Sequence, residues 1–487
     1  MKRNFISNLG FLLFVNLLVK PFWILGIDRT VQNTVGAADY GIYFTLFNFS
    51  LLFQVVLDFG FNNFNNRQIA QRPERIREYF STTMIAKFIF VIAYTIIIFI
   101  AAFGIHFNTY QLHVLMLMVI MQILLSFYSF LRSNVAAMQF FKTDAVLSVL
   151  DKIITCIICS VLIWGNIPGI KITIENFIWV QIIGYLIAGT VATVIVFKYA
   201  SGIKWHFDKL LVKDIIKKSF PYALLGFLMT VYYRVDAVMI ERMSGPNGST
   251  EAGIYASAFR LLDSLNILGY LMAGILLPLF AKMISSKQDI THLFDLSFKL
   301  MLVISASAGI PVLFYREPIM QLLYISGDAY SAQILGLLMI SFISISLIYV
   351  FGSLLTANGS IRILNLISIA GLVVNVVINC FLIPTEKALG ASIATVFTQI
   401  LVLVAHMIAV NKNFNFSIKE KKWLQALGYL LLVIAVNFLL LEINILWSLK
   451  FLLACVVSVL LSFVAGLFKL KELANEVRFL LNRSNRI

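Results

Sequence analysis

Arg234 and Asp236 lie inside residues 220–240, a stretch that is otherwise apolar and long enough to cross a lipid bilayer. A charge inside a membrane helix is costly unless it faces water or a partner, so such residues usually serve transport or charge pairing. With a helical rise of about 1.5 Å per residue, Lys20, Arg234 and Arg260 each lie roughly 10 to 12 Å below the outer end of their span. We therefore predict that these three cations line one water-filled cavity.

Acidic residues accompany two of these cations, and their spacing suggests different roles. Arg260 and Asp263 lie three residues apart on one helical face, where they can satisfy each other. Arg234 and Asp236 lie two residues apart and point in nearly opposite directions, so a local pair is not expected. Asp236, with Asp58 and Asp263 as weaker candidates, is either a coupling carboxylate for a proton or sodium ion or a counter-charge to the arginines.

Membrane helices must position these residues. Of the 487 residues, 60% are hydrophobic and only 13% are charged, a composition that excludes a water-soluble domain. Apolar runs of about 18 to 25 residues, the length that spans a bilayer, predict fourteen transmembrane helices. Their centres are expected near residues 18, 50, 92, 122, 154, 186, 230, 267, 304, 344, 373, 399, 432 and 456. Because the runs are continuously apolar rather than alternating, they predict an all-α fold and not a porin-like barrel.

The net charge of +15 is explained by topology. Basic residues gather in the even-numbered connections and at both termini, whereas the odd-numbered connections hold few. Since basic loops stay in the cytoplasm, both termini are predicted to be cytoplasmic, and no nucleic-acid partner is needed to explain the charge. Four further lysines near the expected ends of spans are predicted to reach the lipid headgroups. They are Lys87, Lys152, Lys299 and Lys450.

The chain is predicted to be a duplication. Asp39-Tyr-Gly-Ile-Tyr43 and Glu251-Ala-Gly-Ile-Tyr255 each close a short outer loop and open the next span. Because the repeat holds six spans, an even number, its halves share one orientation and are related by a pseudo-two-fold axis along the membrane normal. The predicted parts are an N-terminal lobe (1–200), a basic cytoplasmic linker (201–218), a C-terminal lobe (219–410), and two further helices with a cytoplasmic tail (411–487).

Catalytic and metal-binding signatures are absent from the sequence. There is no Walker A, HExxH or GxSxG motif, and the five histidines are scattered singly. We therefore expect no enzyme activity, no catalytic residue, no metal and no cofactor. A proton or a sodium ion is the coupling species to consider.

A set of motifs follows a fixed order along residues 10–410. They are the two Gly-Ile-Tyr openings, Leu57-Asp-Phe-Gly-Phe61, Pro221 with Asp236, Glu251 to Leu261, Pro278, and Asn375 to Ala391. Together they resemble polysaccharide-unit flippases of the Wzx type. One departure follows Ile383-Pro384, where the family often has a Tyr-Gly pair and this chain has Thr385-Glu-Lys-Ala388.

The resemblance implies a fold, a location and a substrate. The family shares a superfamily with multidrug and toxin extrusion (MATE) transporters and the lipid II flippase, which implies a V-shaped, MATE-like fold of two six-helix lobes. It also implies a multi-pass protein of the bacterial inner membrane. Such a protein moves an undecaprenyl-pyrophosphate-linked oligosaccharide from the cytoplasmic to the periplasmic leaflet, for O-antigen, capsule or exopolysaccharide synthesis.

The pyrophosphate of such a substrate is an anionic ligand that could bind the cations of the predicted cavity. Cations in a wet cavity lower the free energy needed to bring a pyrophosphate into a low dielectric, so Lys20, Arg234 and Arg260 are its predicted site. Lys20 matches no family motif and rests on its depth alone. Polar and aromatic side chains at helical contacts can either bind sugars or hold helices together. The predicted glycan contacts are Trp23, Asn48, Tyr233, Tyr255 and Asn375.

Three other functions stay open: a multidrug extruder of the same fold, a lipid II flippase, and a membrane-embedded polysaccharide polymerase or ligase. Drug cations would favour deep acidic sites, whereas the deep charges here are mainly basic, and the short outer loops leave little room for a polymerase site. The expected partners are the lipid-linked oligosaccharide, the bilayer, and the polymerase and chain-length proteins of the same pathway. A monomer is expected.

Overall fold

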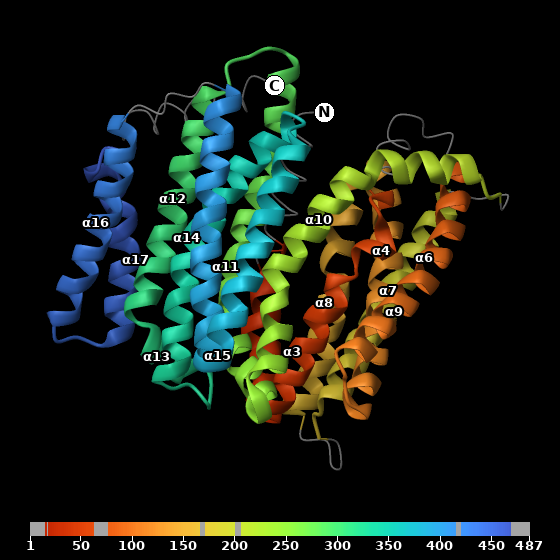
Figure 1. The fold of residues 1–487 in the computed structure, drawn as a ribbon, viewed down its shortest axis with the longest axis horizontal. Helices are drawn as coiled ribbons and strands as arrows, with labels where there is room; N and C mark the ends of the chain where they lie inside the picture. Colours follow the sequence, from red (N-terminus) through yellow and green to blue (C-terminus); the bar gives the residue numbers. More distant parts are fainter. Residues whose placement is uncertain are drawn as a thin grey trace. The chain divides into compact units, whose positions relative to one another are not determined.

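The computed structural model describes residues 15–16, 18–62, 76–165, 171–199, 206–414 and 420–468. Within these ranges the chain forms helices and no β-strand (Figure 1). The elements are η1 (Trp23–Asp28), α2 (Arg29–Val35), α3 (Ala37–Leu52), α4 (Val55–Asp58), α6 (Ile76–Gly104), α7 (Thr109–Ala137), α8 (Phe141–Trp164), α9 (Ile174–Tyr199), α10 (Lys209–Met243), η3 (Gly245–Asn247), α11 (Gly248–Ser285), α12 (Thr291–Phe314), α13 (Arg316–Leu323), α14 (Ala329–Ala357), α15 (Ile361–Phe414), α16 (Glu420–Glu442) and α17 (Trp447–Val464).

Among the described residues, eleven helices are long and apolar enough to cross a membrane. One of them, α15, contains two predicted spans, which meet at a kink where Lys387 has φ 53° and ψ −127°. The described part of the first predicted span ends in η1, and the second predicted span is formed by two shorter pieces, α3 and α4. The all-α fold with many spans that the sequence predicts is confirmed.

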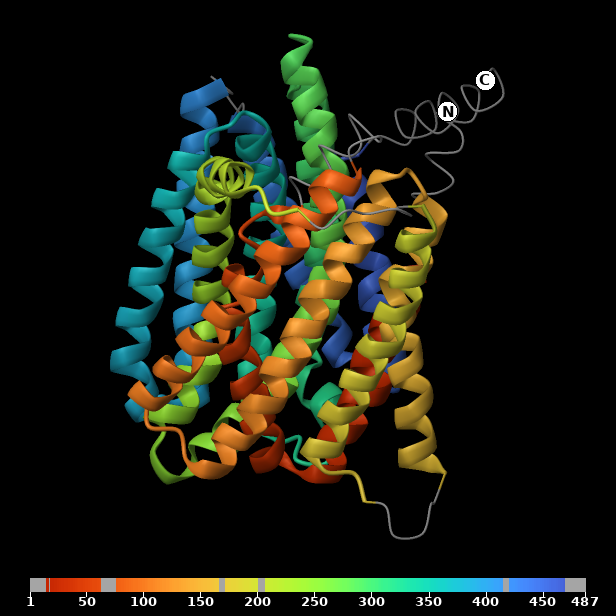
Figure 2. The same ribbon diagram turned by 90° about the vertical axis from the view of Figure 1, so that its right-hand side faces the viewer.

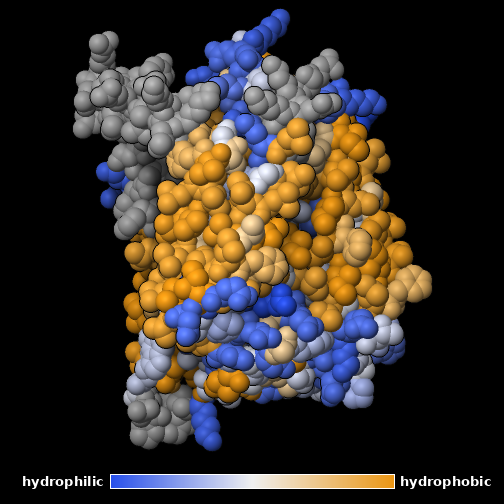
Figure 3. All heavy atoms as spheres, turned by 90° about the vertical axis from the view of Figure 1, so that its left-hand side faces the viewer, coloured by the Kyte–Doolittle hydropathy of each residue, from blue (hydrophilic) through white to orange (hydrophobic). Residues whose placement is uncertain are grey.

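The outer surface of the helices is apolar. Figure 3 shows one face of the molecule with a broad hydrophobic band between two hydrophilic borders. On α16 and α17, Leu431, Leu439, Leu452 and Val456 are exposed. Large apolar side chains on an outer surface are unfavourable in water and favourable in lipid. The chain is a multi-pass membrane protein.

The helices pack into two compact units. The N-terminal unit, Asn4–Ala256, contains η1 to α10, η3 and the first residues of α11. The C-terminal unit, Ser257–Ile487, contains the rest of α11 and all later helices. The predicted lobe boundaries concern the duplication rather than packing, and they stay a prediction.

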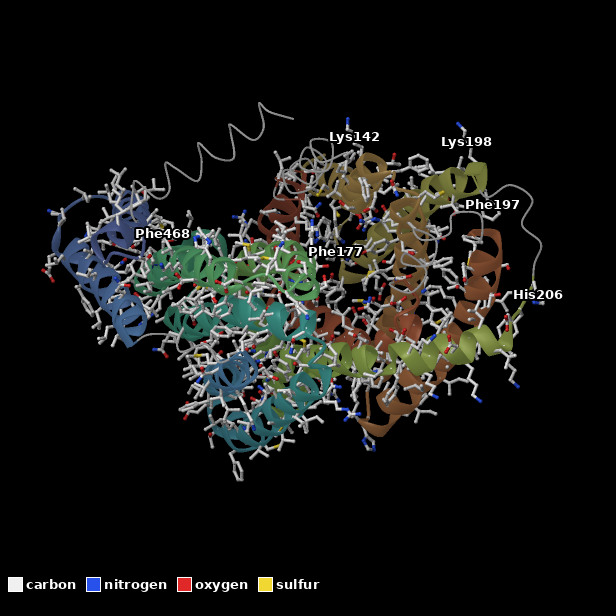
Figure 4. All side chains as sticks on the ribbon, turned by 90° about the horizontal axis from the view of Figure 1, so that it is seen from above. Lys142, Phe177, Phe197, Lys198, His206 and Phe468 are labelled. Carbon is white, nitrogen blue, oxygen red and sulfur yellow. The ribbon has the colours of Figure 1, made fainter. Side chains whose placement is uncertain are left out.

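In the N-terminal unit, α7 packs along α9, α8 packs along α9, and α10 packs along α3 (Figure 2). Reciprocal hydrogen bonds between Asn108 and Gln111 form a capping box at the start of α7. The hydroxyls of Ser81 and Thr82 on α6 donate to the His206 carbonyl oxygen at 3.2 and 3.1 Å. These bonds fasten the segment before α10 to α6. Lys142 and Lys198 extend away from the unit (Figure 4).

In the C-terminal unit, α14 packs against α12 and α15, and α17 packs against α12 and α16. Asp328 and Ser331 form the capping box that starts α14. The short helix α13 lies between two spans and was not predicted, because eight residues give too little periodic signal.

Two spans of the N-terminal unit are irregular. A π-helix, η1, begins at Trp23, two residues after Pro21, whose ring removes one backbone donor and disturbs the preceding turn. The second span is broken between Leu52 and Val55, and again after Asp58, where Phe59 and Gly60 have φ of 41° and 81°. Irregular backbone at membrane depth occurs where protein or a wet cavity satisfies it. These two irregular spans are therefore the places where a site is expected.

Candidate functional site

Arg234 lies on α10 and contacts α3. Its guanidinium Nη1 donates a hydrogen bond to the side-chain oxygen of Asn48 at 3.3 Å. Its guanidinium carbon lies 5.0 Å from the ring centroid of Tyr233. Asn48 is buried, and its amide nitrogen donates to the Phe44 carbonyl oxygen at 2.7 Å, which orients the amide oxygen toward Arg234. The structure therefore brings three predicted site residues together where α10 meets α3.

Asp236 contacts α11. Its carboxylate Oδ2 accepts a hydrogen bond from the Tyr255 hydroxyl at 3.2 Å. Both side chains are buried, with 2% of Asp236 and 1% of Tyr255 exposed. In this structure Asp236 therefore links α10 to the start of α11. Its assignment as a coupling carboxylate stays a prediction.

A second group of charges lies among the first span, α7 and α8. The charged neighbours of Lys20 are the bases Arg132 on α7 and Lys152 on α8 and the acid Asp151 on α8. Arg132 Nε in turn lies 3.0 Å from Asp144 Oδ1. The sequence analysis missed Arg132 as a neighbour of Lys20, because only the fold brings α7 to the first span. Lys20 thus belongs to a mixed cluster in which three bases and two acids lie within the N-terminal unit.

Lys152 is also held by aromatic residues. Its Nζ lies 3.5 Å from Asp151 Oδ2, donates to the Tyr185 hydroxyl at 3.3 Å, and lies 4.7 Å from the ring centroid of Trp23. Trp23 stacks on Phe177 of α9, labelled in Figure 4, with ring centroids 5.6 Å apart. The prediction that Lys152 reaches the headgroups is wrong, because these partners satisfy the ammonium inside the unit. In the sequence, the adjacent Asp151 and Lys152 inside an apolar span indicated that the lysine could have an acidic neighbour within the protein.

Asp58 lines a pocket of about 330 Å³ in the N-terminal unit. Polar residues of α4, α7 and α10 and of the segments on either side of α4 line this pocket, and Tyr222 adds an aromatic side chain. The polar members are Gln54, Asp58, Asn62, Ser126, Ser129 and Thr230. Asp58 is the predicted coupling carboxylate with the clearest access to a pocket, since its side chain is 33% exposed.

Lys87 lies behind this pocket and is only 1% exposed. Its Nζ donates to the Leu57 carbonyl oxygen at 3.1 Å and to Ser126 Oγ at 2.8 Å, and lies 3.7 Å from Asp58 Oδ1. The prediction that Lys87 reaches the headgroups is therefore wrong. Oxygen atoms of Leu57, Asp58 and Ser126 surround the ammonium inside the protein, so it is not hydrogen-bonded at the membrane surface.

The remaining predicted site residues belong to the C-terminal unit. Arg260 Nη1 lies 4.0 Å from Asp263 Oδ2, as the spacing of the pair allows. Asn375 is buried, and its side-chain oxygen accepts a hydrogen bond from Asn379 at 3.1 Å. That Lys20, Arg234 and Arg260 share one cavity stays a prediction, as do the glycan contacts.

At the predicted outer end, α3 and α11 cross closely at the two repeated Gly-Ile-Tyr motifs. A Cβ on Gly41 would collide with the Ser249 carbonyl oxygen, and a Cβ on Gly253 would collide with the Ala37 carbonyl oxygen. The Gln32 side-chain amide donates to the Gly253 carbonyl oxygen at 2.8 Å. The two Gly-Ile-Tyr motifs are visible in the sequence, but their contact was not predicted. Similarity between two motifs does not indicate that they lie close together in space.

Two buried carboxylates lie at the ends of the helices next to this crossing. Asp28 Oδ2 accepts from the Tyr40 hydroxyl at 2.6 Å. Glu241 Oε1 accepts from the Gln111 amide at 2.7 Å and is ion-paired with Arg242. These bonds join η1 to α3 and α10 to α7 beside the crossing.

Comparisons with known proteins place this fold. The family model described as "Polysaccharide biosynthesis protein" matches residues 5–284. A comparison with curated protein sequences finds no significant match. The solved structure of the lipid II flippase MurJ in an inward closed conformation has a TM-score of 0.69 and 14% sequence identity, covering 92% of this chain and 98% of that one.

Two further solved structures have the same fold. A MOP superfamily transporter from Pyrococcus furiosus has a TM-score of 0.60 at 13% identity, covering 84% of this chain and 95% of its own. A MATE structure has a TM-score of 0.58 at 12% identity, covering 83% and 95%. At such identities these likenesses concern the fold alone, whereas the family model matches more than half of the chain. The chain therefore belongs to the polysaccharide biosynthesis protein family and has the fold shared by MurJ and the MATE transporters.

Proposed function

We propose that the chain is a flippase of the Wzx type, which moves an undecaprenyl-pyrophosphate-linked oligosaccharide repeat unit across a bacterial inner membrane. Movement is from the cytoplasmic to the periplasmic leaflet, in the synthesis of O-antigen, capsule or exopolysaccharide. The observation that carries this proposal is membership of a polysaccharide biosynthesis family in a chain built of membrane-spanning helices. It is supported by the fold shared with a lipid II flippase.

The charges of the N-terminal unit suit a pyrophosphate. Arg234 offers a planar fork of N–H donors, which binds phosphate oxygens with two parallel hydrogen bonds. Lys20, Arg132 and Lys152 lie in the mixed cluster of the same unit, where Asp144 and Asp151 are already paired with Arg132 and Lys152. In a low dielectric such cations attract a diphosphate more strongly than in water, which offsets part of its desolvation. A diphosphate headgroup is thus a better match than a cationic drug.

The proposed cycle needs no covalent chemistry. The pyrophosphate and glycan enter a cavity that is open to the cytoplasm, while the polyprenyl tail remains in lipid. The helices then rearrange so that the headgroup faces the periplasm.

Transport of lipid II is the second candidate, and the MurJ likeness favours it. The two substrates share the undecaprenyl pyrophosphate, so the basic residues suit both equally. The consequences for the cell differ. Loss of a lipid II flippase stops cell-wall synthesis and growth, whereas loss of a repeat-unit flippase removes surface glycan.

The test is a chromosomal deletion of the gene, complemented by the wild-type chain. We expect the deletion strain to grow, to lack the surface polysaccharide, and to accumulate lipid-linked repeat units in the cytoplasmic leaflet. Complementation restores display. Unchanged surface glycan in the deletion strain would contradict the proposal, and arrest of growth with accumulation of lipid II would favour the second candidate. Loss of drug resistance alone would indicate an extruder.

A further inference from the structure

The second span of the N-terminal unit leaves backbone oxygen atoms available to side chains. Its α4 segment has only four residues, Val55–Asp58, and the positive φ of Phe59 and Gly60 ends it. The Leu57 carbonyl oxygen accepts hydrogen bonds from two side chains of other helices, Lys87 Nζ at 3.1 Å and Ser126 Oγ at 3.3 Å. Unwound backbone carbonyls of broken helices coordinate cations in several secondary transporters.

The Lys87 ammonium sits where such a cation would be held. Its oxygen neighbours are one backbone carbonyl of Leu57, one hydroxyl of Ser126 and one carboxylate of Asp58, at 3.1, 2.8 and 3.7 Å. The ring of Phe130 lies below it, with its centroid 5.7 Å from Nζ. Carbonyl, hydroxyl and carboxylate oxygens are also the ligands that hard monovalent and divalent cations take in proteins. The site is thus a cation site whose occupant is part of the chain.

We propose that the Lys87 ammonium is the resident cation of this site, so that the ion the site exchanges with water is a proton and not sodium. An ammonium tethered to α6 cannot leave the site as a free ion can. It can only give up a proton, and the pocket beside Asp58 connects the site to water. In such a chain the ammonium occupies the site, and sodium does not bind at the second span.

The groups that face Lys87 fit this assignment. Helix α4 contributes Asp58, the acid that balances the ammonium, while α7 contributes Ser126 and Phe130, neither of which titrates. Helix α10 contributes Tyr222 to the pocket wall. On the neighbouring stretch of α6, Ala86 packs with Phe61 and Ile215 in an apolar cluster. The proton therefore has Asp58 as its acceptor among the described groups that touch Lys87.

The cation site itself is independent of transport, but its use in coupling rests on the proposed function. The test therefore uses stability and needs no substrate. Lys87→Ala removes the ammonium and leaves its oxygen ligands around a space into which sodium fits. The thermal midpoint of the purified full chain is measured in sodium chloride and in choline chloride at equal concentration.

We expect the wild-type midpoint to be the same in both salts. The Lys87→Ala midpoint should be lower in choline and should rise in sodium, by on the order of 2 °C or more, because an ion that binds only the folded state stabilises it. Adding Asp58→Asn to Lys87→Ala should abolish the sodium effect, since the carboxylate ligand is then lost. Lys299→Ala is the matched control, because Lys299 forms an ordinary i,i+4 pair with Asp295 at 3.0 Å. It should show no sodium effect.

A Lys87→Ala midpoint that does not differ between sodium and choline would overturn the proposal. So would a wild-type chain stabilised by sodium as strongly as the variant. If Lys87→Ala does not fold, the proposal is tested by measuring translocation in membrane vesicles that contain the wild-type chain. Translocation of the lipid-linked unit should continue when choline replaces sodium and stop when a protonophore collapses the proton gradient, and a requirement for sodium would refute the assignment. Failure of the stability test leaves the proposed function standing, and failure of the deletion test leaves the cation site standing.

Discussion

Gly41 and Gly253 meet where α3 crosses α11, and each occupies the place at which the other helix exposes a backbone carbonyl. A Cβ on Gly41 would lie 2.8 Å from the Gly253 nitrogen and still closer to the Ser249 carbonyl oxygen. Small residues allow membrane helices to approach this closely, since lipid provides no hydrophobic force between them. The two copies of the repeated motif thus form one contact, in which the glycine of each meets the carbonyl of a residue just before the other motif, Ser249 or Ala37.

The first prediction concerns this contact. Gly41→Ala should lower the free energy of unfolding by about 3 kcal/mol or more, because the clash is with backbone and cannot be relieved by a rotamer change. Gly189→Ala on α9 is the control, since a Cβ there meets nothing within 4 Å. It should be neutral or slightly stabilising. Thermal unfolding of the purified variants measures both, and equal midpoints would show that the crossing is not tightly packed.

The second prediction concerns the bond between Tyr255 and Asp236. Tyr255→Phe removes the hydroxyl and leaves a buried carboxylate with one donor fewer, which should cost about 1 to 3 kcal/mol. The matched control is Tyr270→Phe, since the side chain of Tyr270 is 67% exposed. The same unfolding measurement applies, and a Tyr255→Phe chain as stable as the control would remove the reason to place Asp236 in a helix contact.

The third prediction concerns Lys152 and Asp151. Lys152→Met should destabilise the chain, and Asp151→Asn in the same chain should recover part of the loss, because the unpaired carboxylate is then neutral. The double-mutant cycle should give a coupling energy of about 1 to 2 kcal/mol. The pair Lys299 and Asp295 is the comparison, because it is an i,i+4 pair on one helix whose carboxylate is 25% exposed, against 9% for Asp151. Its coupling should be below about 1 kcal/mol, and equal couplings would contradict a special environment for Lys152.

Much of the fold was predictable because membrane helices are specified locally. A continuous apolar run such as Phe88 to Phe103 must bond its own backbone in lipid, so its helical state follows from composition alone. The breaks of the second span were not predicted, since Phe59 and Gly60 interrupt an apolar stretch without changing its hydropathy. The hydropathy of a local segment therefore predicts where the spans lie, but not where their helices are broken.

The site was predictable only in part, because its contacts join distant segments. Lys87 lies 30 residues from the carbonyl of Leu57 that it bonds, and nothing near Lys87 in sequence indicates that the carbonyl is accessible. Arg234 and Asn48 were both named as site residues, yet their bond depends on how α10 packs against α3. A deep charge can be found from sequence, whereas its partner is found from the fold.

The central claim is that Arg234 binds the diphosphate of a lipid-linked glycan. Its direct test measures surface polysaccharide in the deletion strain carrying Arg234→Ala, Arg234→Lys, or the control Lys218→Ala, which removes an exposed charge from the same helix. With all three proteins present at wild-type amounts in the membrane, we predict loss of display for Arg234→Ala, partial display for Arg234→Lys, and full display for Lys218→Ala. Full display by Arg234→Ala would contradict the claim.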